Sequence, residues 1–83
     1  MSTVTIDPIL LDKARRSPHA VRFEEALRLC RQLGFLKVRH VRGHRILHHP
    51  SRGPLSMQEG PQGRAKAYQV RHLLETARGR RGA

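Results

Sequence analysis

Histidine and arginine gather in one short segment, RHVRGHRILHHP, at residues 39–50. Histidine has an ordinary pKa near neutral, so it can accept or donate a proton at physiological pH. Arginine binds phosphate oxygens through two parallel hydrogen bonds and stabilises negative charge that develops at phosphorus. These residue types suit RNA cleavage in which the ribose 2′-hydroxyl attacks the adjacent phosphate.

A metal site is the alternative use of this segment, because it holds His40, His44, His48 and His49. No carboxylate or cysteine lies nearby to complete a ligand set, so polarity of a strand surface is the simpler explanation. Cys30 is the only cysteine, which excludes a disulfide within one chain and a cysteine-based zinc site. We therefore expect no metal and no cofactor.

The net charge points to a polyanionic partner. Lys and Arg number 17 against 6 acidic residues, for a formal charge of +11, and 14 of the cations are arginine. Such an excess attracts nucleic acid, whose phosphates arginine grips well. A membrane surface is disfavoured, because no segment is apolar enough to span a bilayer and no basic helix carries aromatic anchors. The N-terminal segment shows no signal or transit peptide pattern, so we expect a cytoplasmic protein.

Two helices and a hairpin are predicted around the histidine-rich segment. Residues 7–16 begin with Asp7 as N-cap and Pro8 at the first helical position. Residues 23–33 carry apolar side chains at helical spacing and end before Gly34. The sequences FLKVRH and HRILHH predict two strands joined by a turn that contains Gly43.

A third strand and a last helix complete the prediction. Leu55 and Met57 alternate with Ser56 and Gln58, which predicts a weak strand. The segment EGPQGR predicts a loop, and residues 66–78 predict an amphipathic helix. We expect Phe23 and Leu27 to lie in the core, as well as Cys30, Leu73 and Leu74. Tyr68 is expected in the core as well, with stacking on a base as the alternative.

The order of elements predicts a small α+β domain, α-β-β-β-α, preceded by a short helix. Both main helices should pack on one face of a three-stranded antiparallel sheet, which leaves the other face for RNA. Residues 1–20 are expected to form an N-terminal extension, residues 21–78 the domain, and residues 79–83 a flexible basic tail.

Two segments resemble the HicA toxin family. RFEEALRLCRQLGFLKVRHVRGHRILHHP resembles the family's helix ending at Gly-Phe, its strand pair around a Gly-Ser-His turn, and its His-Pro. QGRAKAYQVRHLLE resembles a variant in which a Gly-rich loop leads into Ala-Lys-Pro-Tyr-Gln and an arginine-bearing helix. Arg42 and Gly43 stand where the family usually has Gly-Ser, and Ala67 stands where the variant often has proline.

The resemblance, which covers roughly residues 22–75, implies a fold similar to double-stranded-RNA-binding domains. It also implies an mRNA-cleaving toxin of a type II toxin–antitoxin system, silenced by an acidic HicB antitoxin. The family's active histidine falls on His44, although a histidine beside a turn, taken alone, is more often a solvated residue. The residues we expect at the RNA are Arg39, Arg42, Arg45, His48, Arg64 and Lys66. His48 is the candidate general acid, because alternation along the strand places it on the face of His44 and Ile46.

Two other functions remain open from the sequence. A non-catalytic module could bind RNA through 2′-hydroxyl and phosphate contacts on the same fold. A DNA-binding accessory protein is weaker, because no helix-turn-helix spacing occurs and neither helix carries a row of residues suited to the major groove.

Overall fold

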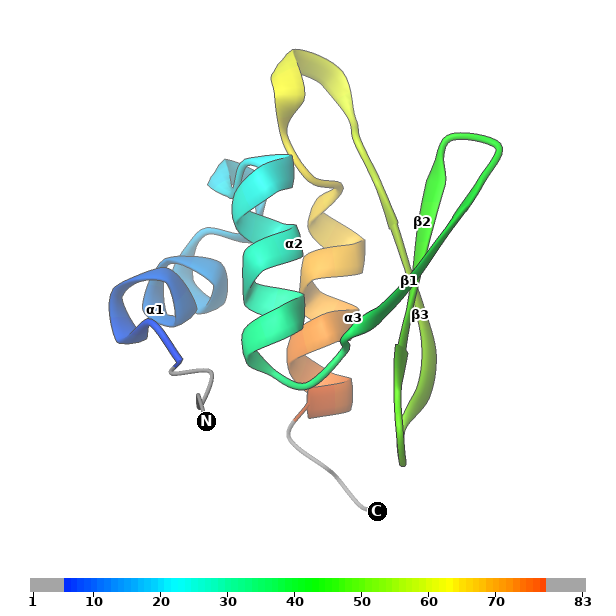
Figure 1. The fold of residues 1–83 in the computed structure, drawn as a ribbon. Helices are drawn as coiled ribbons and strands as arrows, with labels where there is room; N and C mark the ends of the chain where they lie inside the picture. Colours follow the sequence, from blue (N-terminus) through cyan, green and yellow to red (C-terminus); the bar gives the residue numbers. More distant parts are fainter. Residues whose placement is uncertain (1–5, 78–83) are drawn as a thin grey trace.

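The computed structural model describes residues 6–77, and Figure 1 shows their arrangement. The basic tail predicted at residues 79–83 lies outside the described residues. The six main elements, in chain order, are α1 (Pro8–Arg16), α2 (Phe23–Gln32), β1 (Lys37–Val41), β2 (His44–His49), β3 (Gly53–Gln58) and α3 (Ala67–Ala77). A single turn of 3-10 helix at Pro18–Ala20 lies between α1 and α2, and another at Pro61–Gly63 lies between β3 and α3.

The three strands form an antiparallel sheet in the order β1-β2-β3. β1 and β2 are joined at Arg42 and Gly43, whose φ angles are 51° and 81°. Two successive positive φ angles are typical of the tight hairpin turn whose twist matches that of the flanking strands. At the other edge of β2, the ladder to β3 runs from His49 opposite Gly53 to His44 opposite Gln58.

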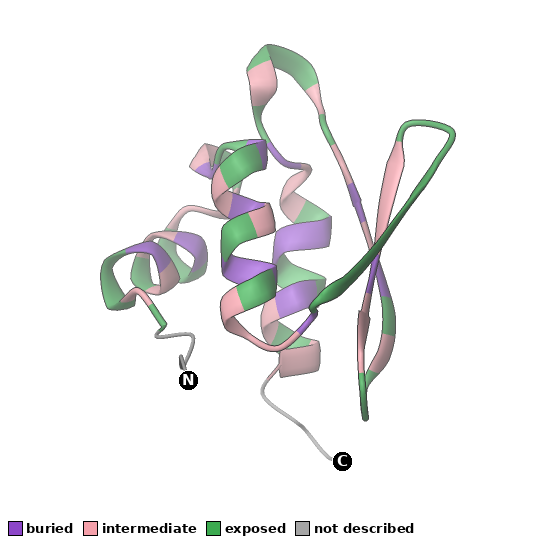
Figure 2. Cartoon of the chain, in the orientation of Figure 1, coloured by how far each residue is buried: buried purple, intermediate pink, exposed green. Residues whose placement is uncertain are grey.

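All three helices lie on one face of the sheet (Figure 1), which confirms the predicted α+β architecture. Figure 2 shows the buried residues between the helices and the sheet. The sheet contributes Leu47, Leu55 and Met57 to this core, and α2 and α3 contribute Leu29 and Leu73 among others. Alternation of buried and less buried residues along β3 is therefore as predicted.

The N-terminal helix α1 shares this core. Its Leu10 and Ala14 belong to the same buried cluster as the residues of the sheet. The Asp7 carboxylate caps the helix by accepting hydrogen bonds from the backbone N–H groups of Ile9 and Leu10, at 3.0 and 3.3 Å. Lys13 Nζ lies 2.9 Å from Glu25 Oε1, which ties α1 to α2.

Several core predictions change in detail. Phe23, Cys30 and Leu73 are buried, whereas Leu27 and Leu74 are only partly buried against the core. The prediction that Tyr68 lies in the core is wrong, because its side chain is 60% exposed. At 3.6 residues per turn, Tyr68 lies about 200° around the helix from buried Val70 and so faces away from the core.

Candidate functional site

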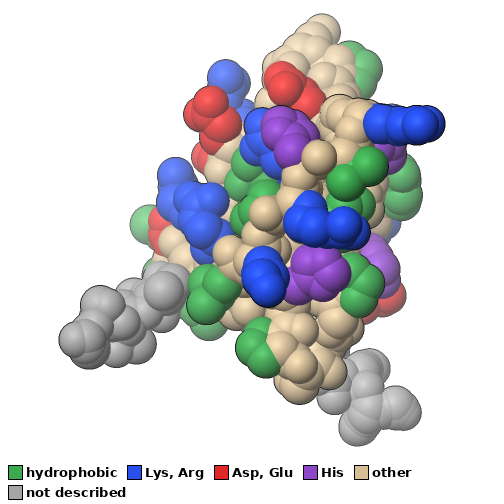
Figure 3. Space-filling view, turned by 45° about the vertical axis from the view of Figure 1, so that its right-hand side comes forward, with side chains coloured by type: hydrophobic (Ala, Val, Ile, Leu, Met, Phe, Trp, Pro, Cys, Tyr) green, Lys and Arg blue, Asp and Glu red, His purple; other side chains and the backbone are tan. Residues whose placement is uncertain are grey.

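The face of the sheet opposite the helices carries the side chains that alternate with the core residues. From β2 these are His44, Ile46 and His48, since the intervening Leu47 is buried. Arg39 of β1 lies opposite Ile46, and Ser56 of β3 lies opposite Ile46 on its other side. In the view of Figure 3, histidine and cationic side chains lie side by side on the surface.

A shallow hollow of about 630 Å³ extends from this face past the edge strand β3 to α3, and we call it the histidine hollow. It is lined by residues of the three strands and of α3: Arg39, His44, Ile46, His48, Pro54, Leu55, Ser56, Tyr68, Gln69 and His72. The structure thus brings together three of the predicted site residues, namely Arg39, His44 and His48.

His44 is half-buried at the start of β2, and its Nδ1 lies 3.3 Å from Ser56 Oγ. In the tautomer in which Nδ1–H donates to Ser56, Nε2 keeps its lone pair and can accept a proton. The partner on the neighbouring strand thereby orients the ring. This arrangement supplies a positioned base on a surface that a polymer can reach.

The helix α3 brings His72, which was not predicted in the site, and Tyr68, which was expected in the core with base stacking as the alternative. Tyr68 and His72 lie four residues apart on the exposed side of α3 and line the histidine hollow. Buried Gln69 fixes α3 beside the sheet, because its Oε1 accepts a hydrogen bond from the backbone N–H of Gln58 at 2.8 Å. Gln69 Nε2 also donates to the hydroxyl of Tyr68 at 3.4 Å, which helps to place the ring.

Helical periodicity alone could have placed Tyr68 and His72 on one side of the last helix. Helical periodicity does not predict that this side of the helix lies beside His44, because that placement depends on packing between elements far apart in the chain. Ser56 was predicted only as an outward-facing residue of the third strand. Its hydrogen bond to His44 follows from the register of β2 and β3.

The other predicted cations lie outside the histidine hollow. Arg45 points to the opposite face of the sheet, where its guanidinium carbon lies 5.3 Å from the centroid of Phe23. Arg42 is exposed in the β1–β2 turn, and Arg64 is exposed in a bridge with Arg22 before α3. Lys66 is half-buried immediately before α3. None of these four cations lines the histidine hollow.

His49 and Cys30 lie outside the histidine hollow, in contacts that belong to the folded core and its loops. The ring of His49 packs on Phe35 with 5.1 Å between the ring centroids. Its Nδ1 accepts a hydrogen bond from the backbone N–H of Ser51 at 3.0 Å. Burial raises the pKa of the Cys30 thiol to about 12, so the thiol stays protonated near neutral pH and is a poor nucleophile. Within residues 6–77, no group of three or more His, Cys, Asp or Glu side chains could hold a metal ion.

Comparisons with protein-family models, curated proteins and solved structures find no match to this chain. A search of the described part of the chain for helices with the length and apolar character of a bilayer span finds none.

Proposed function

We propose that the protein is a HicA-type endoribonuclease toxin that cleaves mRNA with His44 as general base. The observation that carries the proposal is the oriented imidazole of His44, bound to Ser56 within a hollow that also holds His48 and Arg39. The formal charge of +11 supplies the long-range attraction for RNA. Arg42, Arg64 and Lys66 extend the cationic surface along the RNA backbone.

The reaction follows from these side chains. Nε2 of His44 removes the proton of a ribose 2′-hydroxyl, and the 2′-oxygen attacks the adjacent phosphorus. The bond to the 5′-oxygen breaks as the new bond forms, which leaves a 2′,3′-cyclic phosphate on one fragment. His48 donates a proton to the departing 5′-oxygen, and Arg39 stabilises the charge on the phosphoryl oxygens. Tyr68 stacks on a base and holds the backbone extended across the hollow.

An antitoxin is part of the proposal. A free cationic nuclease would bind transcripts without control, so a complementary acidic surface must cover the histidine hollow. A HicB-type protein in the same cytoplasm would supply it. The antitoxin would compete with RNA for His44 and the surrounding cations.

The test compares wild type with His44→Ala in induced expression and with purified protein on a defined RNA. The expected result is arrested growth and cut transcripts for wild type, and cleavage reduced by about 10² to 10⁴-fold for His44→Ala with RNA binding retained. His19→Ala is the matched control, because His19 is exposed on the single turn before α2 and does not line the hollow.

Two results would overturn the proposal. Cleavage at the wild-type rate by His44→Ala would remove the base from the mechanism. Wild-type protein that binds RNA tightly but never cuts it would instead favour a non-catalytic RNA-binding module, which the exposed Tyr68 and the cationic face would equally serve.

A further inference from the structure

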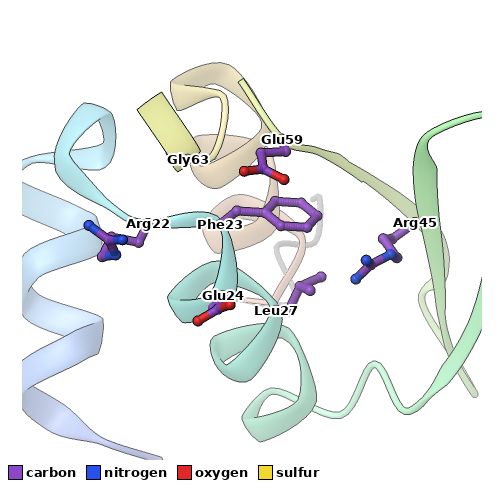
Figure 4. A pocket seen from close by; sticks show the side chains of 7 residues that line it. All are labelled: Arg22, Phe23, Glu24, Leu27, Arg45, Glu59 and Gly63. Carbon is purple, nitrogen blue, oxygen red and sulfur yellow. The ribbon is translucent and has the colours of Figure 1, made fainter. Parts of the chain in front are cut away.

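A second hollow, of about 260 Å³, lies on the helix side of the sheet, and we call it the Phe23 hollow. It lies between the start of α2, the start of β2 and the residues after β3, and its lining includes Phe23, Leu27, Arg45, Glu59 and Gly63. Figure 4 shows the ring of Phe23 at its centre, with Glu59 and Arg45 approaching from different sides. Arg22 and Glu24 also line it, but the side chain of Arg22 extends away from the ring (Figure 4).

Arg45 presents its planar guanidinium to this hollow, and two contacts fix the position of that group. Its Nε donates a hydrogen bond to His40 Nε2 at 3.0 Å, and its guanidinium carbon lies 5.3 Å from the Phe23 centroid. A guanidinium plane held in this way is a surface on which a nucleobase can stack. Phe23 and Leu27 supply the apolar floor.

Glu59 presents a carboxylate acceptor to this hollow. Its carboxylate lies above the ring of Phe23 (Figure 4), and the residue is exposed. Gly63 lies beside this carboxylate, because a Cβ at position 63 would be in van der Waals contact with Glu59 Oε2, at 3.6 Å. The salt bridges found among residues 6–77 join Lys13 to Glu25 and Arg16 to Asp12, and neither uses Glu59.

We propose that the Phe23 hollow binds a guanine base of the RNA and gives the nuclease a preference for guanine beside the cleaved phosphate. The proposal rests on the proposed function, because it assigns a substrate preference to the same protein. Guanine presents N1–H and N2–H as adjacent donors, which match the two oxygens of the Glu59 carboxylate. Adenine places the acceptor N1 at the same position, where a carboxylate repels it.

The Phe23 hollow and the histidine hollow lie on different sides of the sheet, but both reach the end of the β2–β3 ladder that holds His44, which supports a role on one RNA strand. Arg45 directly follows His44, and the two side chains point to opposite faces of β2. His44 and Gln58 form the last pair of the β2–β3 ladder, and Glu59 follows Gln58. A single strand that passes around this end of the ladder would place a phosphate at His44 and a neighbouring base at Glu59.

The test measures binding of six-nucleotide oligouridine RNAs that carry guanine or adenine at one position, by fluorescence anisotropy. His44→Ala serves as the non-cleaving background. Guanine should be preferred over adenine by about tenfold, the discrimination expected of one good bidentate base contact. Glu59→Gln in this background should reduce the ratio to about one. Glu75→Gln removes the same charge from an exposed position on α3 that does not line the Phe23 hollow, and it should leave the ratio unchanged.

The outcomes separate this proposal from the proposed function. Cleavage that depends on His44, combined with equal binding of the guanine and adenine RNAs, overturns the guanine site alone. A preference for guanine that survives Glu59→Gln also overturns it. Failure of the His44→Ala protein to bind any of these RNAs overturns both proposals.

Discussion

Gly34 is the position where a single methyl group should disturb the fold most directly. It follows α2 with a φ of +100°, a backbone conformation that L-residues rarely adopt. A Cβ at this position would lie 2.8 Å from Cδ2 and 2.9 Å from Nε2 of His49. Gly34→Ala therefore strains the backbone and displaces the ring of His49 from its place beside Phe35.

The magnitude follows from these contacts. An L-residue in the left-handed region costs about 1–2 kcal/mol. Displacement of the His49 ring weakens its packing on Phe35, for about 0.5–1.5 kcal/mol, and its hydrogen bond from Ser51, for about 0.5 kcal/mol. We expect Gly34→Ala to lower the free energy of unfolding by about 2–4 kcal/mol, and the melting temperature by about 10–25 °C.

Gly53→Ala is the matched control. Gly53 has a φ of +83°, but a Cβ there would meet nothing within 4 Å, so only the backbone cost of about 1–2 kcal/mol applies. Urea and thermal unfolding, followed by circular dichroism, measure both variants. The difference between them reports the displacement of His49. If Gly34→Ala proves no less stable than Gly53→Ala, the reasoning from the His49 contact is refuted.

Two further predictions concern the RNA surface and the pH dependence of stability. Tyr68→Ala should weaken RNA binding by about tenfold or more through the loss of stacking, with little change in melting temperature because the side chain is 60% exposed. A large fall in melting temperature with unchanged RNA affinity would contradict this. The hydrogen bond from Lys13, and next that from the backbone N–H of Arg22, lower the pKa of Glu25 from its ordinary 4.5. The resulting stabilisation, about 0.5–1 kcal/mol for a partly exposed pair, is present above pH 4.5 and is lost as pH falls through the lower folded pKa. The free energies of unfolding in urea of wild type and Glu25→Gln should therefore differ at pH 7 and become equal near pH 3. An equal difference at both pH values would assign the effect to packing.

The sequence by itself determined the elements whose signals are local. Asp7 and Pro8 specify the start of α1, and apolar spacing predicts α2, which ends at Gln32 just before Gly34. Gly43 predicts the hairpin turn, and the alternation of Leu55 and Met57 predicts β3. These features were predictable because caps, turns and periodic burial depend on residues within a few positions of one another.

The tertiary structure alone decided which side chains meet. The hydrogen bond from the backbone N–H of Gln58 to Gln69 Oε1 helps to hold α3 so that Tyr68 and His72 lie beside His44. This hydrogen bond joins residues 11 positions apart in the chain. The prediction grouped Arg45 with His44 at the RNA, but packing placed its guanidinium over Phe23, in the hollow that Glu59 also lines. Contacts of this kind depend on how helices dock on a sheet, and helix periodicity specifies a side of each helix without specifying its neighbour.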